Sequence, residues 1–297
     1  MLKIDVQNDK SELIQYNLPE MPIYINKLYL KIEHDFSLEC HWHEDIEFVL
    51  VTLGELQYNI NGKCITLKKG QGVFVNARQM HHGFSVGENE CECITVIFHP
   101  SLIYPNEQFK LKYINPVINN KNLDFLVLSD ETEWGGEVFN KLVEVYDTYS
   151  KDENSILELQ SRFYGIWSVI YNNMPEEGYV QHGKEYKVIA LKEMVAFIHT
   201  NFMQKITLSD ISVAGKVCRS KCCKLFKEYL HQTPTDYLTA HRLRKAIKSL
   251  SEESEPMSEV AANAGFAGAS YFSEIFKKNY NCSPSEYRRR LKTQKNK

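Results

Sequence analysis

The residues best suited to chemistry lie between positions 41 and 82, where histidines and one glutamate recur at short spacing. His41 and His43 are two positions apart, so that on a β-strand both side chains point to the same face. With Glu47 and a later imidazole, from His81 or His82, they could hold a divalent transition-metal ion. The alternative is that each histidine lines a small-molecule pocket or forms hydrogen bonds within a core.

The spacing His41-x-His43-x3-Glu47-x6-Gly54 resembles the first sequence motif of the cupins, which are small β-barrel domains. The second cupin motif is incomplete, because Lys69-Gly-Gln-Gly stands where Pro-Gly-Asp is usual and the histidine is doubled. The resemblance implies either a metal-dependent cupin enzyme or an effector pocket. The incomplete motif favours the pocket, with no catalytic residue and no required cofactor. The expected effector contacts are His41, Trp42, His43, Glu47 and His81.

Short apolar runs surround these residues and predict an antiparallel barrel over residues 1–130. The runs are separated by Gly54, by Asn61-Gly62 and by the glycines at 70 and 72. Asn-Gly between two such runs is typical of a tight β-hairpin. The expected strands cover residues 47–53, 56–60, 63–67, 73–75 and 93–98.

The next segment, residues 131–174, predicts a pair of helices at 136–149 and 155–173, because apolar residues recur there at helical spacing. The pair could pack on the barrel of its own chain or mediate dimerisation. Residues 175–186 are polar and contain Gly and Pro, which indicates a linker. Residues 187–297 predict helices throughout. The fold class is therefore multidomain, an antiparallel cupin β-barrel with two helices followed by an all-α domain.

A repeat in this helical domain indicates its function. Leu225–Tyr237 returns fifty residues later as Ile275–Tyr287, and each copy follows a short helix, a turn and a second helix. Residues 184–297 contain 21 Lys and Arg against 11 Asp and Glu, a net charge of +10 in a chain of net charge −3. Two helix-turn-helix modules in a basic domain favour binding to double-stranded DNA.

Several motifs in these 110 residues resemble the signature of AraC/XylS-type transcriptional regulators. They include Val260-Ala-x-x-Ala-Gly-Phe, Ser270-Tyr-Phe-Ser and Ser283-Pro-x-x-Tyr-Arg in the second module, and Thr233-Pro-x-x-Tyr in the first. The resemblance implies that the second helix of each module enters a major groove. The expected DNA contacts are Arg219, Ser220, Lys221, Cys223 and Lys224 in the first module and Gly268, Ala269, Ser270, Ser273 and Glu274 in the second.

Three positions depart from the family pattern. Lys216 stands where the first turn usually has Gly, and Gly215 comes one residue early, so we expect a rearranged turn. Cys218 replaces a capping Ser, which weakens the start of its helix. Glu274 stands where Arg is common; it can accept a hydrogen bond from cytosine N4 or form a salt bridge with a neighbour. Base contacts should therefore concentrate in the first module.

Other features limit the cellular setting. The eight cysteines lack zinc-finger spacing and suit small buried residues in a reducing cytosol. No signal-peptide pattern and no apolar run of about 20 residues occurs, which favours a cytoplasmic protein without membrane contact. The family resemblance implies a homodimer that responds to a small molecule such as a sugar and activates transcription with RNA polymerase.

Overall fold

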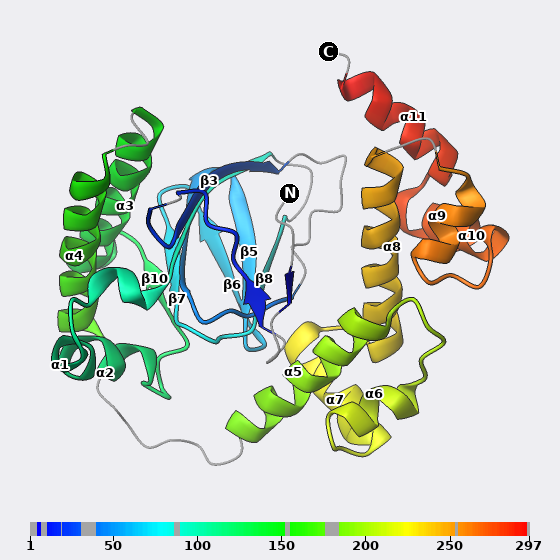
Figure 1. Cartoon of the computed structure of the whole chain (residues 1–297), viewed down its shortest axis with the longest axis horizontal. Coiled ribbons are helices and arrows are strands. Elements are labelled where there is room, and N and C mark those ends of the chain that lie inside the picture. Colours follow the sequence, from blue (N-terminus) through cyan, green and yellow to red (C-terminus); the bar gives the residue numbers. More distant parts are fainter. Residues whose placement is uncertain are drawn as a thin grey trace. The chain divides into compact units, whose positions relative to one another are not determined.

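The computed structural model describes residues 5–6, 11–18, 20–30, 40–85, 90–151, 155–175, 184–252 and 255–295. The chain divides into two compact units, residues 1–182 and 183–297. The first is rich in antiparallel strands, and the described part of the second consists of helices and turns, as the sequence predicts (Figure 1). Most of the predicted linker 175–186 lies outside the described residues. Its last three residues, 184–186, belong to a helix instead.

Two antiparallel sheets form the barrel of the first unit. The smaller sheet contains β6 (Lys63–Lys68), β5 (Glu55–Ile60) and β8 (His81–Ser85), and a two-stranded ribbon, β1 (Asp5–Val6) with β2 (Glu12–Leu13), lies near the N-terminus. The predicted Asn-Gly turn joins β5 to β6, with φ of 49° at Asn61 and 83° at Gly62. In spatial order, the larger sheet contains β10 (Phe125–Leu128), β7 (Gly72–Val75), β4 (Ile46–Leu53), β9 (Cys91–Phe98) and β3 (Ile23–Leu30).

Side-chain alternation along β4 decides which residues face the barrel interior. Val49 and Val51 pack with Tyr58 of β5 in a cluster that fills the space between the sheets. Phe48 and Leu50 point to the opposite face and join a second apolar cluster. Glu47 has the parity of Val49, so this strand directs its carboxylate into the barrel.

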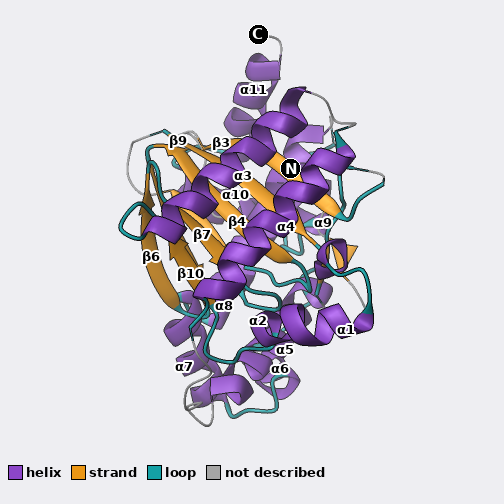
Figure 2. Ribbon diagram, turned by 90° about the vertical axis from the view of Figure 1, so that its left-hand side faces the viewer, coloured by secondary structure: helices purple, strands orange, loops and turns teal. Residues whose placement is uncertain are grey.

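The predicted helical pair forms α3 (Glu133–Lys151) and α4 (Ile156–Asn173), which lie across the outer face of the larger sheet (Figure 2). Their apolar stripes are buried against that sheet, and the rings of Phe98 and Phe163 lie 4.9 Å apart. The predicted apolar faces therefore pack on the chain's own barrel. The connection from β9 contains η1 (Pro100–Ile103), α1 (Glu107–Phe109), the π-helical turn η2 (Lys110–Ile114) and α2 (Asn115–Ile118).

The second unit contains the two predicted helix-turn-helix modules. Both second helices end at a left-handed residue, His231 with φ of 56° and Asn281 with φ of 54°. Among the described residues, no helix is both long enough and apolar enough to cross a membrane. The first module is α6 (Leu208–Ala214) with α7 (Arg219–Leu230), and the second is α9 (Met257–Asn263) with α10 (Ala269–Tyr280). The other helices are α5 (Lys184–Asn201), α8 (Pro234–Glu252) and α11 (Pro284–Lys295).

Candidate functional sites

Four of the predicted effector contacts converge inside the barrel. The segments that carry His41 and His81 form a β-bridge, in which each backbone N–H donates to the other residue's carbonyl, at 3.1 and 2.9 Å. This bridge brings together residues forty positions apart. The side chains of His41, His43, Glu47 and His81 each offer a ligand atom, and these atoms lie within 4.8 Å of one another.

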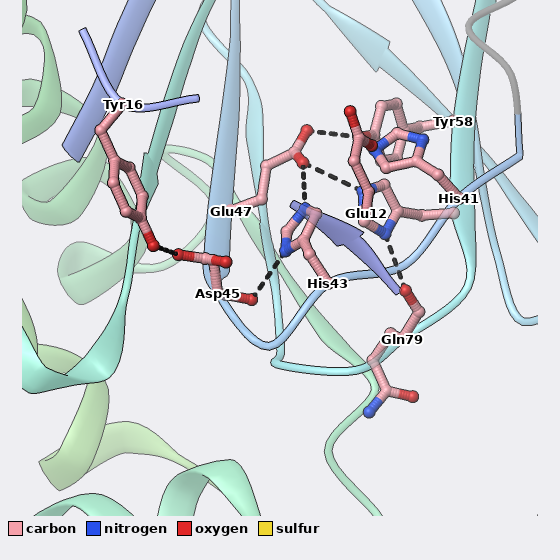
Figure 3. Close-up of polar contacts among 9 residues, drawn as sticks. Glu12, Tyr16, His41, His43, Asp45, Glu47, Tyr58 and Gln79 are labelled. Atoms are coloured by element: carbon pink, nitrogen blue, oxygen red, sulfur yellow. Dashed lines mark hydrogen bonds and ion pairs between the residues drawn. The ribbon is translucent and has the colours of Figure 1, made fainter. Parts of the chain in front are cut away.

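The Glu47 carboxylate lies at the centre of this cluster (Figure 3). Its Oε2 is 3.2 Å from Nε2 of His43 and 3.0 Å from Nε2 of His81. Its Oε1 accepts a hydrogen bond of 2.7 Å from the Tyr58 hydroxyl. The carboxylate is 3% exposed, so these groups replace the water it would bind in the unfolded chain.

Burial and mutual charge shift the pKa values of these groups in opposite directions. Burial alone raises the pKa of Glu47, but the charges and hydrogen bonds of His81 and His43 outweigh it and hold that pKa well below its usual range. Burial lowers the pKa of His43, but the hydrogen bond and charge of Glu47 more than compensate, and the net shift is upward. Burial next to this carboxylate raises the pKa of Tyr58 well above its usual value.

The sequence motif missed two further groups at the site, Glu12 and Tyr58. Glu12 is buried on β2, its Oε2 lies 3.5 Å from Nε2 of His41, and its backbone N–H donates to the Trp42 carbonyl at 2.8 Å. A carboxylate from the N-terminal segment therefore reaches the histidines. No spacing rule links it to them, whereas Tyr58 could have been found from alternation along its apolar strand.

The ambiguity between the two adjacent histidines is resolved. His81 belongs to the cluster, whereas the ring of His82 stacks on Phe84 at 5.9 Å. Three imidazoles and a carboxylate form a donor set that suits a divalent transition-metal ion. In such a site His41, His43, Glu47 and His81 would hold an ion, which would supply a centre of positive charge inside the barrel. Trp42 is also buried, and its carbonyl accepts a hydrogen bond from the backbone N–H of Glu12.

The predicted DNA contacts lie along the first halves of α7 and α10. On α7, Arg219, Ser220 and Lys224 are exposed, while Lys221 and Cys223 are half-buried. On α10, Gly268, Ser270 and Glu274 are exposed, Ser273 is half-buried, and Ala269 packs against the core of its module. Three of the five positions on α7 carry Arg or Lys, and none of the five on α10 does. The two helices therefore present different chemistry on the same fold.

The turns of the two modules have the same hydrogen bonds but different residues. In the first, Lys216 and Val217 donate to the carbonyls of Val213 and Ser212; in the second, Gly265 and Phe266 donate to those of Ala262 and Ala261. Lys216 has φ of 54° and Gly265 has φ of 79°. The expectation of a rearranged first turn was therefore wrong, because Lys216 adopts the left-handed conformation itself.

Comparison with known proteins agrees with both halves of this description. A family model described as a helix-turn-helix domain matches residues 216–290, and a cupin-domain model matches residues 29–97. An uncharacterised HTH-type transcriptional regulator, YdeC of Bacillus subtilis, is 25% identical, over 96% of this chain and 97% of its own. The melibiose operon regulatory protein of Escherichia coli is 22% identical, over 90% of this chain and 91% of its own. The chain belongs to the AraC family of transcriptional regulators.

Two further proteins resemble this AraC-type regulator, one over a shorter segment and one at lower identity. The lactose operon transcription activator of Staphylococcus xylosus is 32% identical over 45% of this chain and 43% of its own. The crystal structure of ToxT from Vibrio cholerae covers 91% of this chain and 98% of its own, at 16% identity and a TM-score of 0.47.

The other departures of this AraC-type regulator from the family pattern are visible at the helix starts. Cys218 is the N-cap of α7 and makes no side-chain capping hydrogen bond, as expected. In contrast, α6 starts with a full capping box, in which Thr207 and Asp210 bond each other's backbone N–H. Among the ion pairs of the described residues, none involves Glu274, so its carboxylate faces solvent on α10.

Proposed function

We propose that this AraC-type regulator binds promoter DNA as a homodimer in the cytoplasm and activates transcription in response to a small molecule held in the barrel. The observation that carries the proposal is the paired helix-turn-helix geometry with a basic, exposed α7. Basic side chains at the start of such a helix bind phosphates and the acceptor edge of guanine. The barrel supplies the effector site through its buried polar cluster, and no catalytic step is needed.

The likeness to named regulators supports the choice of a sugar as effector and of activation over repression. Two relatives carry names that refer to the melibiose and lactose operons, and one of these is named an activator. An activator of this kind would recruit RNA polymerase to a neighbouring promoter. The barrel, in residues 1–130, would sense the sugar, and residues 187–297 would contact DNA.

The proposed dimer would use the outward faces of α3 and α4, in residues 131–174, because their apolar stripes are already buried in the barrel unit. The outward face of α4 carries Leu157, which is 87% exposed, followed by Ser161 and Ser168 at helical spacing. Dimerisation would place four modules on one DNA site and raise the overall affinity through effective concentration.

Selection from random double-stranded DNA, followed by titration of the selected site, tests DNA recognition. Lys224→Ala should weaken binding to that site about tenfold to a hundredfold, since one good base contact contributes about 1–3 kcal/mol of discrimination. Glu274→Ala should change it little. Lys69→Ala removes one exposed lysine from the barrel unit and serves as the charge-matched control. Equal affinity of the Lys224→Ala variant and the wild type would reject the assignment of α7 to base contacts.

A further inference from the structure

The two helix-turn-helix modules are connected along the chain by α8 (Figure 1). A second connection runs through space, at the turn of residues 202–204 that follows α5. A Cβ on Gly265, in the turn of the second module, would lie 2.2 Å from the Phe202 carbonyl oxygen and 2.9 Å from Cα of Met203. The backbone of the turn after α5 therefore lies directly against the turn of the second module, with no room for a side chain between them.

The helix α5 itself packs against the turn of the first module. A Cβ on Gly215 would lie 2.9 Å from the Ala190 carbonyl oxygen and 2.6 Å from Cγ of Met194, and both residues belong to α5. The helix thus contacts the first module near its middle, and the turn at its end contacts the second. Because hydrogen bonds fix the backbone of a helix, these two contacts hold both turns at a set separation and rotation.

Arg242 on α8 holds the turn after α5 through two backbone carbonyls. Its Nε donates to the Phe202 carbonyl at 2.9 Å, and its Nη2 donates to the Gln204 carbonyl at 2.8 Å. The guanidinium is planar and presents its N–H groups in a fixed fork, so the two bonds set the position and the orientation of the turn. The Phe202 carbonyl is also the group that meets Gly265. The hydrogen bond from Arg242 therefore acts at the contact between the modules.

Arg242 lies where the turn after α5 meets α8 and α10. The ring of Phe202 packs on α8, with its centroid 4.9 Å from that of His241 and 6.0 Å from Nζ of Lys245. Burial lowers the pKa of the Arg242 guanidinium, and the nearby Tyr271 side chain on α10 raises it in part. One side chain therefore joins the start of the first module to the connecting helix and to the second module.

In the second module, positive charge lies beyond the five predicted contact positions. Lys277 and Lys278 are exposed in the last turn of α10, and Arg289 and Arg290 are exposed on α11. Such groups bind phosphates, which occur at every base pair and carry no sequence information directly. The second module is therefore suited to hold the DNA backbone after the first module has found its site.

We propose that the turn after α5, held by Arg242, makes the two modules one rigid unit, in which sequence reading by the first places the second on the neighbouring groove as a backbone clamp. Arg242 is a positioning residue that acts through the turn. Rigidity increases affinity because the second module is already in place and loses little freedom on binding. The inference rests on the proposed function in taking α7 and α10 as the helices that enter DNA.

The test compares two duplexes, one with a single copy of the site selected from random DNA and one shortened by a helical turn, about 10 base pairs. The turn is removed from the end where base changes matter least. The wild-type full-length protein should bind the long duplex about a hundredfold more tightly than the short one. Arg242→Ala should reduce this ratio to about tenfold or less, and Arg242→Lys to an intermediate value, since the ammonium keeps the charge without the fork. Lys205→Ala, at an exposed lysine on the same segment, is the matched control and should keep the wild-type ratio.

Amide hydrogen exchange tests the contact between the modules without DNA. Arg242→Ala should speed exchange of the Gly265 and Phe266 amides about tenfold, because the turn of the second module opens locally. The amides of Lys216 and Val217 in the first turn should exchange at the wild-type rate. If no DNA is selected, the proposed function fails, and the exchange rates still decide whether Arg242 joins the modules.

Two results would overturn the inference. Arg242→Ala could weaken binding to the long and short duplexes equally, which would show a role in stability alone. The variant could also keep both the wild-type ratio and the wild-type exchange rates, which would show that the modules are held together without Arg242. If Arg242→Ala fails to fold, judged by its far-ultraviolet circular dichroism, Arg242→Lys replaces it, and an unchanged ratio in that variant would equally reject the clamp.

Discussion

In the turn of the second module, Gly265 both adopts a left-handed φ and leaves room for neighbouring backbone. In the first module these two roles belong to different residues. The φ of Gly265 is 79°, and a Cβ on it would lie 2.2 Å from the Phe202 carbonyl oxygen. In the first module, Lys216 has the left-handed φ of 54°. The close approach there belongs to Gly215, where a Cβ would lie 2.9 Å from the Ala190 carbonyl oxygen. Gly265→Ala should therefore be much more damaging than any change at Lys216.

The cost of Gly265→Ala can be worked out from these two roles. The left-handed conformation costs a non-glycine residue about 1 kcal/mol. The steric overlap involves backbone of the segment after α5, which cannot rotate away, and overpacking of this kind costs about 1–3 kcal/mol. The helical unit should lose about 2–4 kcal/mol of unfolding free energy. With a urea slope of about 2 kcal/mol/M, the midpoint should fall by about 1–2 M.

The three tryptophans make the measurement specific to one unit. Trp42, Trp134 and Trp167 all lie in residues 1–182, so their fluorescence reports the barrel unit. Far-ultraviolet circular dichroism is dominated by helices and follows the second unit as well. Gly265→Ala should lower the urea midpoint of the helical signal and leave the tryptophan transition unchanged. Lys216→Ala, the matched control, should change stability by less than about 0.5 kcal/mol. Equal effects of the two variants would refute the steric argument.

Four smaller predictions concern packing, dimerisation and capping. Tyr58→Phe leaves Oε1 of Glu47 buried without its donor and should cost the chelator-treated barrel unit about 1–3 kcal/mol by tryptophan fluorescence. Phe163→Ala should cost that unit about 3–5 kcal/mol, because the ring is fully buried beneath α4, while Leu111→Ala, at a side chain that is 64% exposed on η2, should leave its stability unchanged. The Leu157→Glu variant should sediment as a monomer if α4 forms the dimer contact. Thr207→Ala removes the α6 capping box and should lower the helical transition by about 1 kcal/mol.

Alternation along strands made the central part of the barrel site predictable. His41 and His43 share a face, and Glu47 has the parity of the buried valines that follow it, so the motif located three of its four members. Glu12 could not be found this way, because it lies outside the barrel strands and meets His41 only through tertiary packing. A periodic pattern records which face of an element is buried, and carries no information about distant partners.

Sequence patterns also left two features of the helices open: the partner of the apolar stripes on α3 and α4, and the conformation of the turn after α6. The sequence predicts two amphipathic helices at 136–149 and 155–173, but an apolar stripe does not say whether its partner is the same chain or another. The sequence predicts a rearranged first turn because glycine is the usual residue at a left-handed φ, and the structure contradicts this prediction. Gly215, with φ of −81°, is needed for close approach to α5, while Lys216, exposed to solvent, tolerates the left-handed conformation.

The two buried carboxylates also restrict the class of effector. Glu12 and Glu47 lie within the same group of imidazoles, each less than 5% exposed, so the histidines offset part of their charge. A carboxylate only accepts hydrogen bonds, so the two side chains favour an effector with hydroxyl donors, such as a sugar.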